Sequence, residues 1–146
     1  RLNKQFKDKT TRKVYWAMVS PKPPKQQDEL IHFLVRNSKQ NKSYAHINEV
    51  PNAKRGVLRY RLIRSFTHYH LLEIDLETGR HHQIRAQLAA IGCSIKGDLK
   101  YGAKRSNPDG GIHLHARKLT LIHPTLKEEM SFEARLPKDS LWDIVT

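Results

Sequence analysis

The chain has 146 residues, 38% hydrophobic and 28% charged, which suits one domain with a modest core and excludes a disordered protein. No apolar run approaches the roughly 18 residues of a membrane span, and no apolar segment follows a basic start, so we expect neither a membrane protein nor a secreted one. Lysine and arginine total 27 against 14 acidic residues, a net charge of +13 that favours a polyanionic partner.

The N-terminal residues have the pattern of a helix end. The chain starts with Arg1, not with Met, and Leu2 and Phe6 stand at helical spacing with no capping residue ahead of them. We therefore expect residues 1–8 to end a helix and the chain to be a piece of a longer polypeptide. Residues 13–19 (KVYWAMV) are dense in β-branched and aromatic side chains, which predicts a buried strand.

The next segment is polar and contains weaker strand signals. Prolines in residues 20–24 (SPKPP) break the first strand, and two further strands are predicted over residues 30–35 and 43–47. Residues 37–44 (NSKQNKSY) have the composition of a loop, so we expect a mobile loop around 37–56.

Two runs of alternating residues follow. Apolar side chains alternate with arginines in residues 57–64 (VLRYRLIR) and with acidic residues in 70–77 (HLLEIDLE). This alternation predicts an antiparallel pair of strands with one buried face. The bases of one strand are then expected to pair with the acids of the other on the solvent face.

A helix is predicted directly after the second of these strands. Thr78 is a suitable N-cap, Ile84, Leu88 and Ile91 stand at i, i+4 and i+7, and Gly92 is suited to the position after the helix end. The spacing indicates about three helical turns.

The C-terminal part combines a glycine-rich loop with two more strands. The loop covers residues 97–111, the strands are predicted over 118–123 and 129–135, and a closing helix over 139–145. The chain is thus expected to be an α+β protein, with a mixed, mainly antiparallel sheet and few flanking helices.

The positive charge is concentrated in the first part of the chain. Residues 1–64 carry a net charge of +12, residues 65–125 a net charge of +3, and residues 126–146 a net charge of -2. Such an excess favours nucleic acid as the partner, because each cation near a phosphate releases a condensed counterion. A merely solubilising surface is the alternative, and a membrane surface is less favoured because no long basic amphipathic helix is present.

No metal or organic cofactor is predicted. The nine histidines include two pairs at strand spacing, His68 with His70 and His113 with His115, but one cysteine and no HExxH helix give no recognisable metal site. Cys93 cannot form an internal disulfide, and its place beyond a helix C-terminus does not favour a thiolate, so we interpret it as structural. A reducing compartment, the cytoplasm, is expected. The glycines match no nucleotide-binding loop.

The segment with the clearest chemistry is residues 76–85 (LETGRHHQIR). A strand ends there, a Thr-Gly turn follows, and Arg80 and Arg85 lie in the first turns of the predicted helix. A helix N-terminus favours anions, and two arginines add bidentate donors. The pattern by itself predicts a pocket for a carboxylate or a phosphate.

Four motifs of the chain, in order, resemble those of the RluA-type pseudouridine synthases, which isomerise uridine in structured RNA. Residues 76–85 resemble the TGR-x-HQIR motif, and residues 13–19 are similar to the K-x-Y-x-A-x-V motif. Residues 90–98, followed by 101–102, resemble the G-x-P-x-x-GD…YG segment, and residues 114–124 resemble the LHA…L…HP segment.

The resemblance implies a mainly antiparallel sheet with a basic cleft, no cofactor, and ribosomal or transfer RNA as the partner. It implies that Tyr15 is the active-site tyrosine that packs against the target base, and that Arg85 pairs with the catalytic aspartate. An aromatic face can replace the stacking lost when a base is flipped out. RNA-binding or supporting roles are expected for the remaining motif positions, Lys13, Arg80, His82 and Gln83.

The chain departs from the family in one serious respect and two minor ones. Ser94 and Lys96 stand where the family has proline and an apolar residue, and both look tolerable. The HRLD-type motif that carries the nucleophilic aspartate in the family is absent, and none of the seven aspartates has that context. We therefore expect a catalytic-domain fragment that is inactive by itself. The alternatives are a non-catalytic RNA-binding module and, less favoured, a basic ribosome-associated structural protein; no oligomeric state is predicted.

Overall fold

One antiparallel sheet makes up most of the protein, a computed structural model of which describes residues 11–122 and 129–133. The strand order is β3-β2-β4-β5-β1-β7-β8, with the short β6 also paired to β1, and all these pairs are antiparallel. The strands are β1 (Thr11–Ser20), β2 (Gln27–Asn37), β3 (Lys42–His46), β4 (Lys54–Ser65), β5 (His70–Leu76), β6 (Ser94–Ile95), β7 (Leu114–Ile122) and β8 (Glu129–Glu133). The α+β class and the mainly antiparallel sheet are confirmed.

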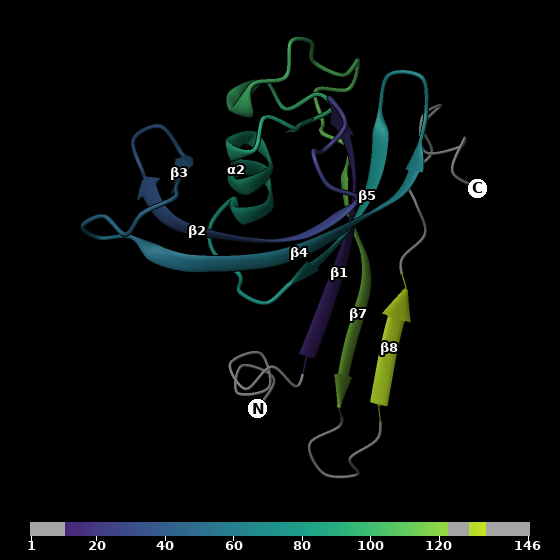
Figure 1. Cartoon of the computed structure of the whole chain (residues 1–146), viewed down its shortest axis with the longest axis horizontal. Helices are drawn as coiled ribbons and strands as arrows, with labels where there is room; N and C mark the ends of the chain where they lie inside the picture. Colours follow the sequence, from purple (N-terminus) through teal and green to yellow (C-terminus); the bar gives the residue numbers. More distant parts are fainter. Residues whose placement is uncertain (1–10, 123–128, 134–146) are drawn as a thin grey trace.

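A single α-helix in the described ranges, α2 (Gln83–Ala90), covers one face of the sheet, where β2 and β4 curve past it (Figure 1). A short 3-10 helix, η1 (Leu99–Tyr101), follows β6. The main core lies under α2. Ile84 and Leu88 of α2 pack there against alternate residues of the central strands. Those strand residues are Ala17, Val19, Leu58, Tyr60, Leu72 and Ile74. We call this side of the sheet the helix face and the opposite side the outer face.

The alternation in β4 and β5 predicts their pairing correctly. Apolar residues of both strands lie on the helix face, and the charged residues between them lie on the outer face. Arg59 pairs with Glu77 at 2.8 Å, and Arg61 pairs with Glu73 at 3.1 Å. Because both arginines are about half exposed, each pair contributes about 0–1 kcal/mol.

The strands predicted over residues 30–35 and 43–47 are confirmed as β2 and β3, so the segment 37–56, expected to be a mobile loop, contains a strand. β2 ends at Asn37, a tight turn follows, and Lys42–His46 form β3, which pairs back onto β2. The turn needs a residue with positive φ, which Asn41 supplies at 49°, and asparagine tolerates that conformation well. We call residues 36–46 the β2–β3 hairpin.

The helix begins later than predicted, and Thr78 is not its N-cap. α2 starts at Gln83, and the residue at its N-cap position is His82. The backbone of His82 is left-handed, with a φ of 52°, and its side chain makes no capping hydrogen bond. The helix has eight residues, so it is little longer than two turns. Its end is as predicted: Gly92 has a φ of 82° and donates its N–H to the carbonyl of Ala89 at 2.9 Å.

The C-terminal strands are confirmed with altered bounds. β7 begins at Leu114, four residues before the predicted start, because the bulge beside Tyr15 interrupts the alternation that marks a strand. β8 is described over Glu129–Glu133. The helices expected over residues 1–8 and 139–145 lie outside the described residues.

Candidate active site around Arg85

The turn that leads into α2 is organised by the buried side chain of Gln83. Its Oε1 accepts hydrogen bonds from Thr78 Oγ1 at 2.8 Å and from the Arg80 N–H at 3.0 Å. Its Nε2 donates to the carbonyl of Val57 at 3.1 Å and to Gln87 Oε1 at 2.8 Å. Both amide hydrogens and both acceptor sites are therefore used. Residues 78–82 form a turn around this amide instead of a first helical turn, which explains why Thr78 does not cap the helix.

Replacing Gln83 with methionine is expected to lower the free energy of unfolding by about 1–3 kcal/mol, because its four partners lose their hydrogen bonds in the interior. Urea unfolding measures this change. The matched control is Gln27→Met, because Gln27 is an exposed residue at the start of β2. This substitution is expected to change the free energy of unfolding by less than about 0.5 kcal/mol. Equal effects of the two substitutions would contradict the role of Gln83 as the organiser of the turn.

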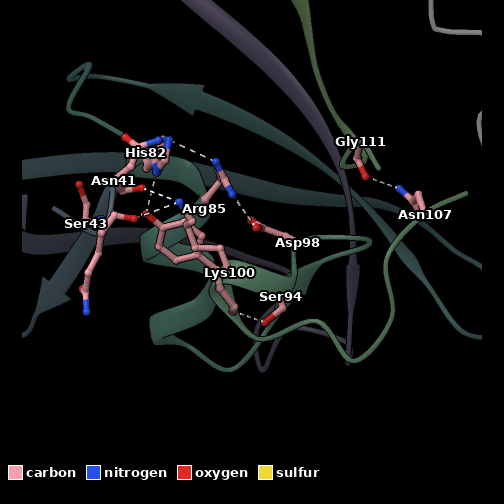
Figure 2. Close-up of polar contacts among 11 residues, drawn as sticks. Asn41, Ser43, His82, Arg85, Ser94, Asp98, Lys100, Asn107 and Gly111 are labelled. Carbon is pink, nitrogen blue, oxygen red and sulfur yellow. Dashed lines mark hydrogen bonds and ion pairs between the residues drawn. The ribbon is translucent and has the colours of Figure 1, made fainter. Parts of the chain in front are cut away.

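Arg85 projects from α2 toward the loop after β6, where it meets Asp98 (Figure 2). Arg85 Nε donates to Asp98 Oδ2 at 2.8 Å, and Arg85 Nη2 donates to Asp98 Oδ1 at 2.7 Å. The guanidinium also lies over the ring of Tyr101, 4.8 Å from its centroid. The Asp98 side chain is 1% exposed and that of Arg85 is 20% exposed. The hydrogen bonds to Asp98 raise the pKa of Arg85 above its ordinary value, so the guanidinium is always charged.

His82 is the third partner of Arg85, whose Nη1 lies 3.2 Å from His82 Nε2. A guanidinium only donates, so Nε2 accepts and the ring proton is on Nδ1. Nδ1 then donates to Tyr101 Oη at 2.8 Å, and the same oxygen accepts the N–H of Ser43 at 2.8 Å. Burial and the charge of Arg85 lower the pKa of His82 to about 4, so the ring is neutral near pH 7.

Replacing His82 with asparagine is expected to reduce the loss of stability on acidification. The folded protein takes up this proton near pH 4 and the unfolded chain near pH 6.5, so stability falls as the pH is lowered between these values. Asparagine does not titrate and tolerates the positive φ. The free energy of unfolding, measured by urea at several pH values, is expected to depend less on pH in the variant. The remaining dependence comes from groups that include His32, His70 and His81, whose pKa values are also lowered. Identical slopes for variant and wild type would contradict the assignment.

The β2–β3 hairpin is held against this cluster by polar contacts. His81 Nε2 donates to Asn41 Oδ1 at 3.1 Å, and Ser43 Oγ donates to His81 Nδ1 at 2.7 Å. Lys100 Nζ donates to the carbonyl of Asn41 at 3.0 Å. Burial and the charges of Arg36, Arg85 and Lys100 lower the pKa of His81.

Tyr15 and Lys13 lie side by side on the helix face, two residues apart in β1. Tyr15 is partly buried against the main core and is paired in register with Ile74 on one side and with Ala116 on the other. A bulge in β7 lies at this point, between the register pairs Val14–Lys118 and Tyr15–Ala116. Such bulges re-aim side chains. Tyr15 is only partly buried, and its small register partner Ala116 is exposed.

The structure brings the predicted residues to one face but not all into contact. No hydrogen bond or ion pair described for residues 13–117 joins Tyr15 to Arg85. Lys13 reaches the Thr78-Gly79 turn, where its Nζ lies 3.4 Å from the position a Cβ would take on Gly79. Arg80 is exposed, and its Nε donates to the carbonyl of Arg55 at 3.0 Å.

Gln83 is the predicted RNA-binding residue that the structure places elsewhere. It is 3% exposed and all its hydrogen-bonding capacity is used inside the protein, so it supports the turn and does not face solvent. Cys93 is buried, and burial raises its pKa, which agrees with a structural thiol.

A cavity lies on the outer face, away from Arg85. It is lined by four acidic residues and two arginines, with Gln27 and Tyr60. The charged lining residues are Asp28, Glu29, Arg59, Arg61, Glu73 and Asp75. Its mixed charge does not suit a polyanion. In the part of the chain that the structure covers, no group of three or more histidine, cysteine or acidic side chains could hold a metal ion, and no helix is long and apolar enough to cross a membrane.

The family model described as RNA pseudouridylate synthase matches residues 1–90 of the chain. The chain belongs to this family. An uncharacterised RNA pseudouridine synthase of Chloroflexus aurantiacus is 37% identical over 133 residues, which are 88% of this chain and 40% of that protein. The ribosomal large subunit pseudouridine synthase C of Rickettsia bellii is 33% identical over 139 residues, which are 94% of this chain and 46% of that protein. These relatives confirm the RluA-type resemblance.

Solved structures of pseudouridine synthase domains share the fold. The human protein RNA pseudouridylate synthase domain containing 4 superposes with a TM-score of 0.77 at 25% identity, over 94% of this chain and 62% of that one. The present chain thus spans less than half the length of the two bacterial relatives and about three fifths of the human domain.

Two residues of this pseudouridine synthase chain that sequence reasoning missed are Asp98 and Tyr101. Both belong to the GD…YG segment, but the motif alone does not tell that its aspartate faces Arg85, 13 residues earlier. The available signal is a lone aspartate that follows a glycine and stands between two lysines, Lys96 and Lys100, shortly before a tyrosine. When such an aspartate is buried, its carboxylate needs a cation as a partner, because an unpaired buried charge is strongly unfavourable.

Proposed function

We propose that the whole protein isomerises uridine to pseudouridine in RNA, and that this chain supplies the arginine and the tyrosine of the site. The observation that carries the proposal is Arg85, a charged guanidinium with a fixed direction and a partly open side on the helix face of a pseudouridine synthase domain. A glycosidic rearrangement that uses a carboxylate nucleophile needs such a cation to keep the carboxylate ionised and aimed.

Tyr15 is proposed to contact the flipped base. It is partly buried in the central strand, with the small Ala116 beside it, so a planar base has room to lie against its ring. Stacking on an aromatic side chain contributes about 1–3 kcal/mol for each base. This offsets part of the cost of removing a base from its helix.

Lys13 and Arg80 are proposed to contact the RNA backbone. Both lie beside the turn that precedes α2, and Arg80 is exposed. His82 is proposed to support Arg85 and not to touch RNA, because both its ring nitrogens are bonded within the protein. No metal or organic cofactor takes part in the proposed reaction.

The substrate is proposed to be ribosomal RNA, as the name of the Rickettsia bellii relative suggests for that protein, with transfer RNA as the second candidate. The proposed site of action is the cytoplasm. The chain by itself is proposed to be inactive, because none of its aspartates lies in an HRLD-type motif.

The test is release of tritium from RNA that carries 5-tritiated uridine, with the whole protein and residues 1–146 compared on ribosomal and transfer RNA. We expect release by the whole protein alone. Absence of release by both, together with binding of the RNA, would instead identify a non-catalytic RNA-binding module. Release by residues 1–146 would refute the proposal that the nucleophile lies outside them.

A further inference from the structure

The guanidinium of Arg85 is held in three independent ways. The ring of Tyr101 under it sets the plane, since its centroid is 4.8 Å away. Asp98 takes the edge formed by Nε and Nη2, with hydrogen bonds of 2.8 and 2.7 Å, and so prevents rotation within that plane. His82 takes one hydrogen of Nη1 at 3.2 Å.

The remaining donors are limited in number and position. A guanidinium has five N–H groups. Among the residues that the structure describes, Asp98 and His82 use three of these, which leaves one N–H on Nη1 and one on Nη2. Arg85 is 20% exposed and Asp98 only 1%, so the open side of the pair belongs to the arginine.

We propose that Asp98 is a positioning residue, which turns Arg85 so that its two unused N–H groups face the carboxylate nucleophile of the whole protein. The inference rests on the proposed function and extends it to a residue that touches neither the base nor the nucleophile. Two carboxylates then share one guanidinium. The buried carboxylate of Asp98 sets the direction of Arg85, and the carboxylate of the nucleophile takes part in the reaction. A displacement of about 1 Å at a catalytic group can cost about a hundredfold in rate.

The position of Asp98 is itself set by its neighbours. Gly97 before it has a φ of 86°, and the amide of Asn107 fills the space where a Cβ would be. The backbone of Asp98 donates to the carbonyl of Ile95 at 3.0 Å, and its carbonyl accepts the N–H groups of Tyr101 and Ala103. Because these bonds fix its backbone, Asp98 can act as a rigid support for Arg85.

The decisive variant is Asp98→Asn in the whole protein, which keeps the size of the side chain and removes its charge. We expect kcat for tritium release to fall about a hundredfold while KM for RNA stays unchanged. The Nε–H signal of Arg85, observed by NMR on protein with labelled arginine, is expected to lose its protection from solvent exchange. The matched control is Asp109→Asn, which changes an exposed aspartate of the neighbouring loop.

Three outcomes would overturn the role of Asp98. These are a folded Asp98→Asn variant with wild-type kcat, an Arg85 signal that stays protected, and a loss of activity that only follows the loss of folded protein. If Asp98→Asn does not fold, Asp98→Glu keeps the charge and moves it by one methylene, and it is expected to lower kcat and shift the Arg85 signal. Wild-type kcat in that variant would also overturn the proposal.

Absence of tritium release by the wild-type protein would refute the proposed function itself. An active wild-type protein together with an equally active Asp98→Asn variant would refute the positioning role alone.

Discussion

Replacement of Arg85 with methionine is expected to abolish the proposed isomerisation of uridine by the whole protein while its affinity for RNA stays largely intact. The nucleophilic carboxylate would lose the cation that keeps it ionised and aimed. RNA affinity depends mainly on the many other basic residues, since the chain has 27 lysines and arginines. Tritium release measures the first effect and filter binding the second. Turnover in the variant would refute the assigned role.

The same substitution is also expected to lower the free energy of unfolding by about 3–5 kcal/mol, because it leaves the carboxylate of Asp98 buried without a counter-charge. The double variant Arg85→Met with Asp98→Asn removes that charge and is expected to recover much of the lost stability but none of the activity. Arg59→Met, on the outer face, is the matched control for loss of an arginine. If the double variant were as unstable as the single one, the buried ion pair would not explain the loss.

Replacement of Gly97 with alanine is expected to lower the free energy of unfolding by about 2–5 kcal/mol. Its φ of 86° is strained for any residue with a Cβ, and that Cβ would stand 2.5 Å from Asn107 Nδ2 and 2.7 Å from the carbonyl oxygen of Gly111. The resulting shift would also move Asp98. Urea unfolding measures the stability, and tritium release by the whole protein is expected to fall with it.

Gly92→Ala separates backbone strain from packing in this comparison. Gly92 has a φ of 82°, close to that of Gly97, but apart from its chain neighbours no residue that the structure describes has a heavy atom within 4 Å of its Cβ position. Its substitution is therefore expected to cost only the conformational strain, about 1 kcal/mol. If both substitutions lowered the free energy of unfolding equally, the close contacts with Asn107 and Gly111 would not contribute to the effect of Gly97→Ala.

Much of the sheet could be predicted from local patterns. The strict alternation in β4 and β5 is a property of neighbouring residues, and it determines which face is buried, so both the strands and their antiparallel pairing follow from it. The helix start could not be predicted in this way. Thr78 has the chemistry of an N-cap, but the buried amide of Gln83 recruits its hydroxyl, and that competition depends on the carbonyl of Val57 in another strand.

The candidate site shows the same limit. The motifs that contain Arg85 and Tyr15 are local in sequence, so the resemblance can point to both residues, whereas Asp98 is brought to Arg85 by the loop after β6. The resemblance implies a supporting or RNA-binding role for Gln83 as one of the remaining motif positions, and four internal hydrogen bonds show that it is buried in the turn. Which polar side chain faces inward is decided by tertiary contacts, not by spacing.

The central place of β1 has a consequence for synthesis of the protein on the ribosome. β1 is made first among the described strands, but its neighbours β5 and β7 begin only at residues 70 and 114. At about 5–20 residues per second, β1 emerges several seconds before β5 exists, while β2, β3 and β4 can already pair with one another. The strand that carries Tyr15 is therefore expected to find its sheet neighbours only after the β3-β2-β4 part of the sheet can form. Its apolar faces are the part of the nascent chain that a chaperone would bind.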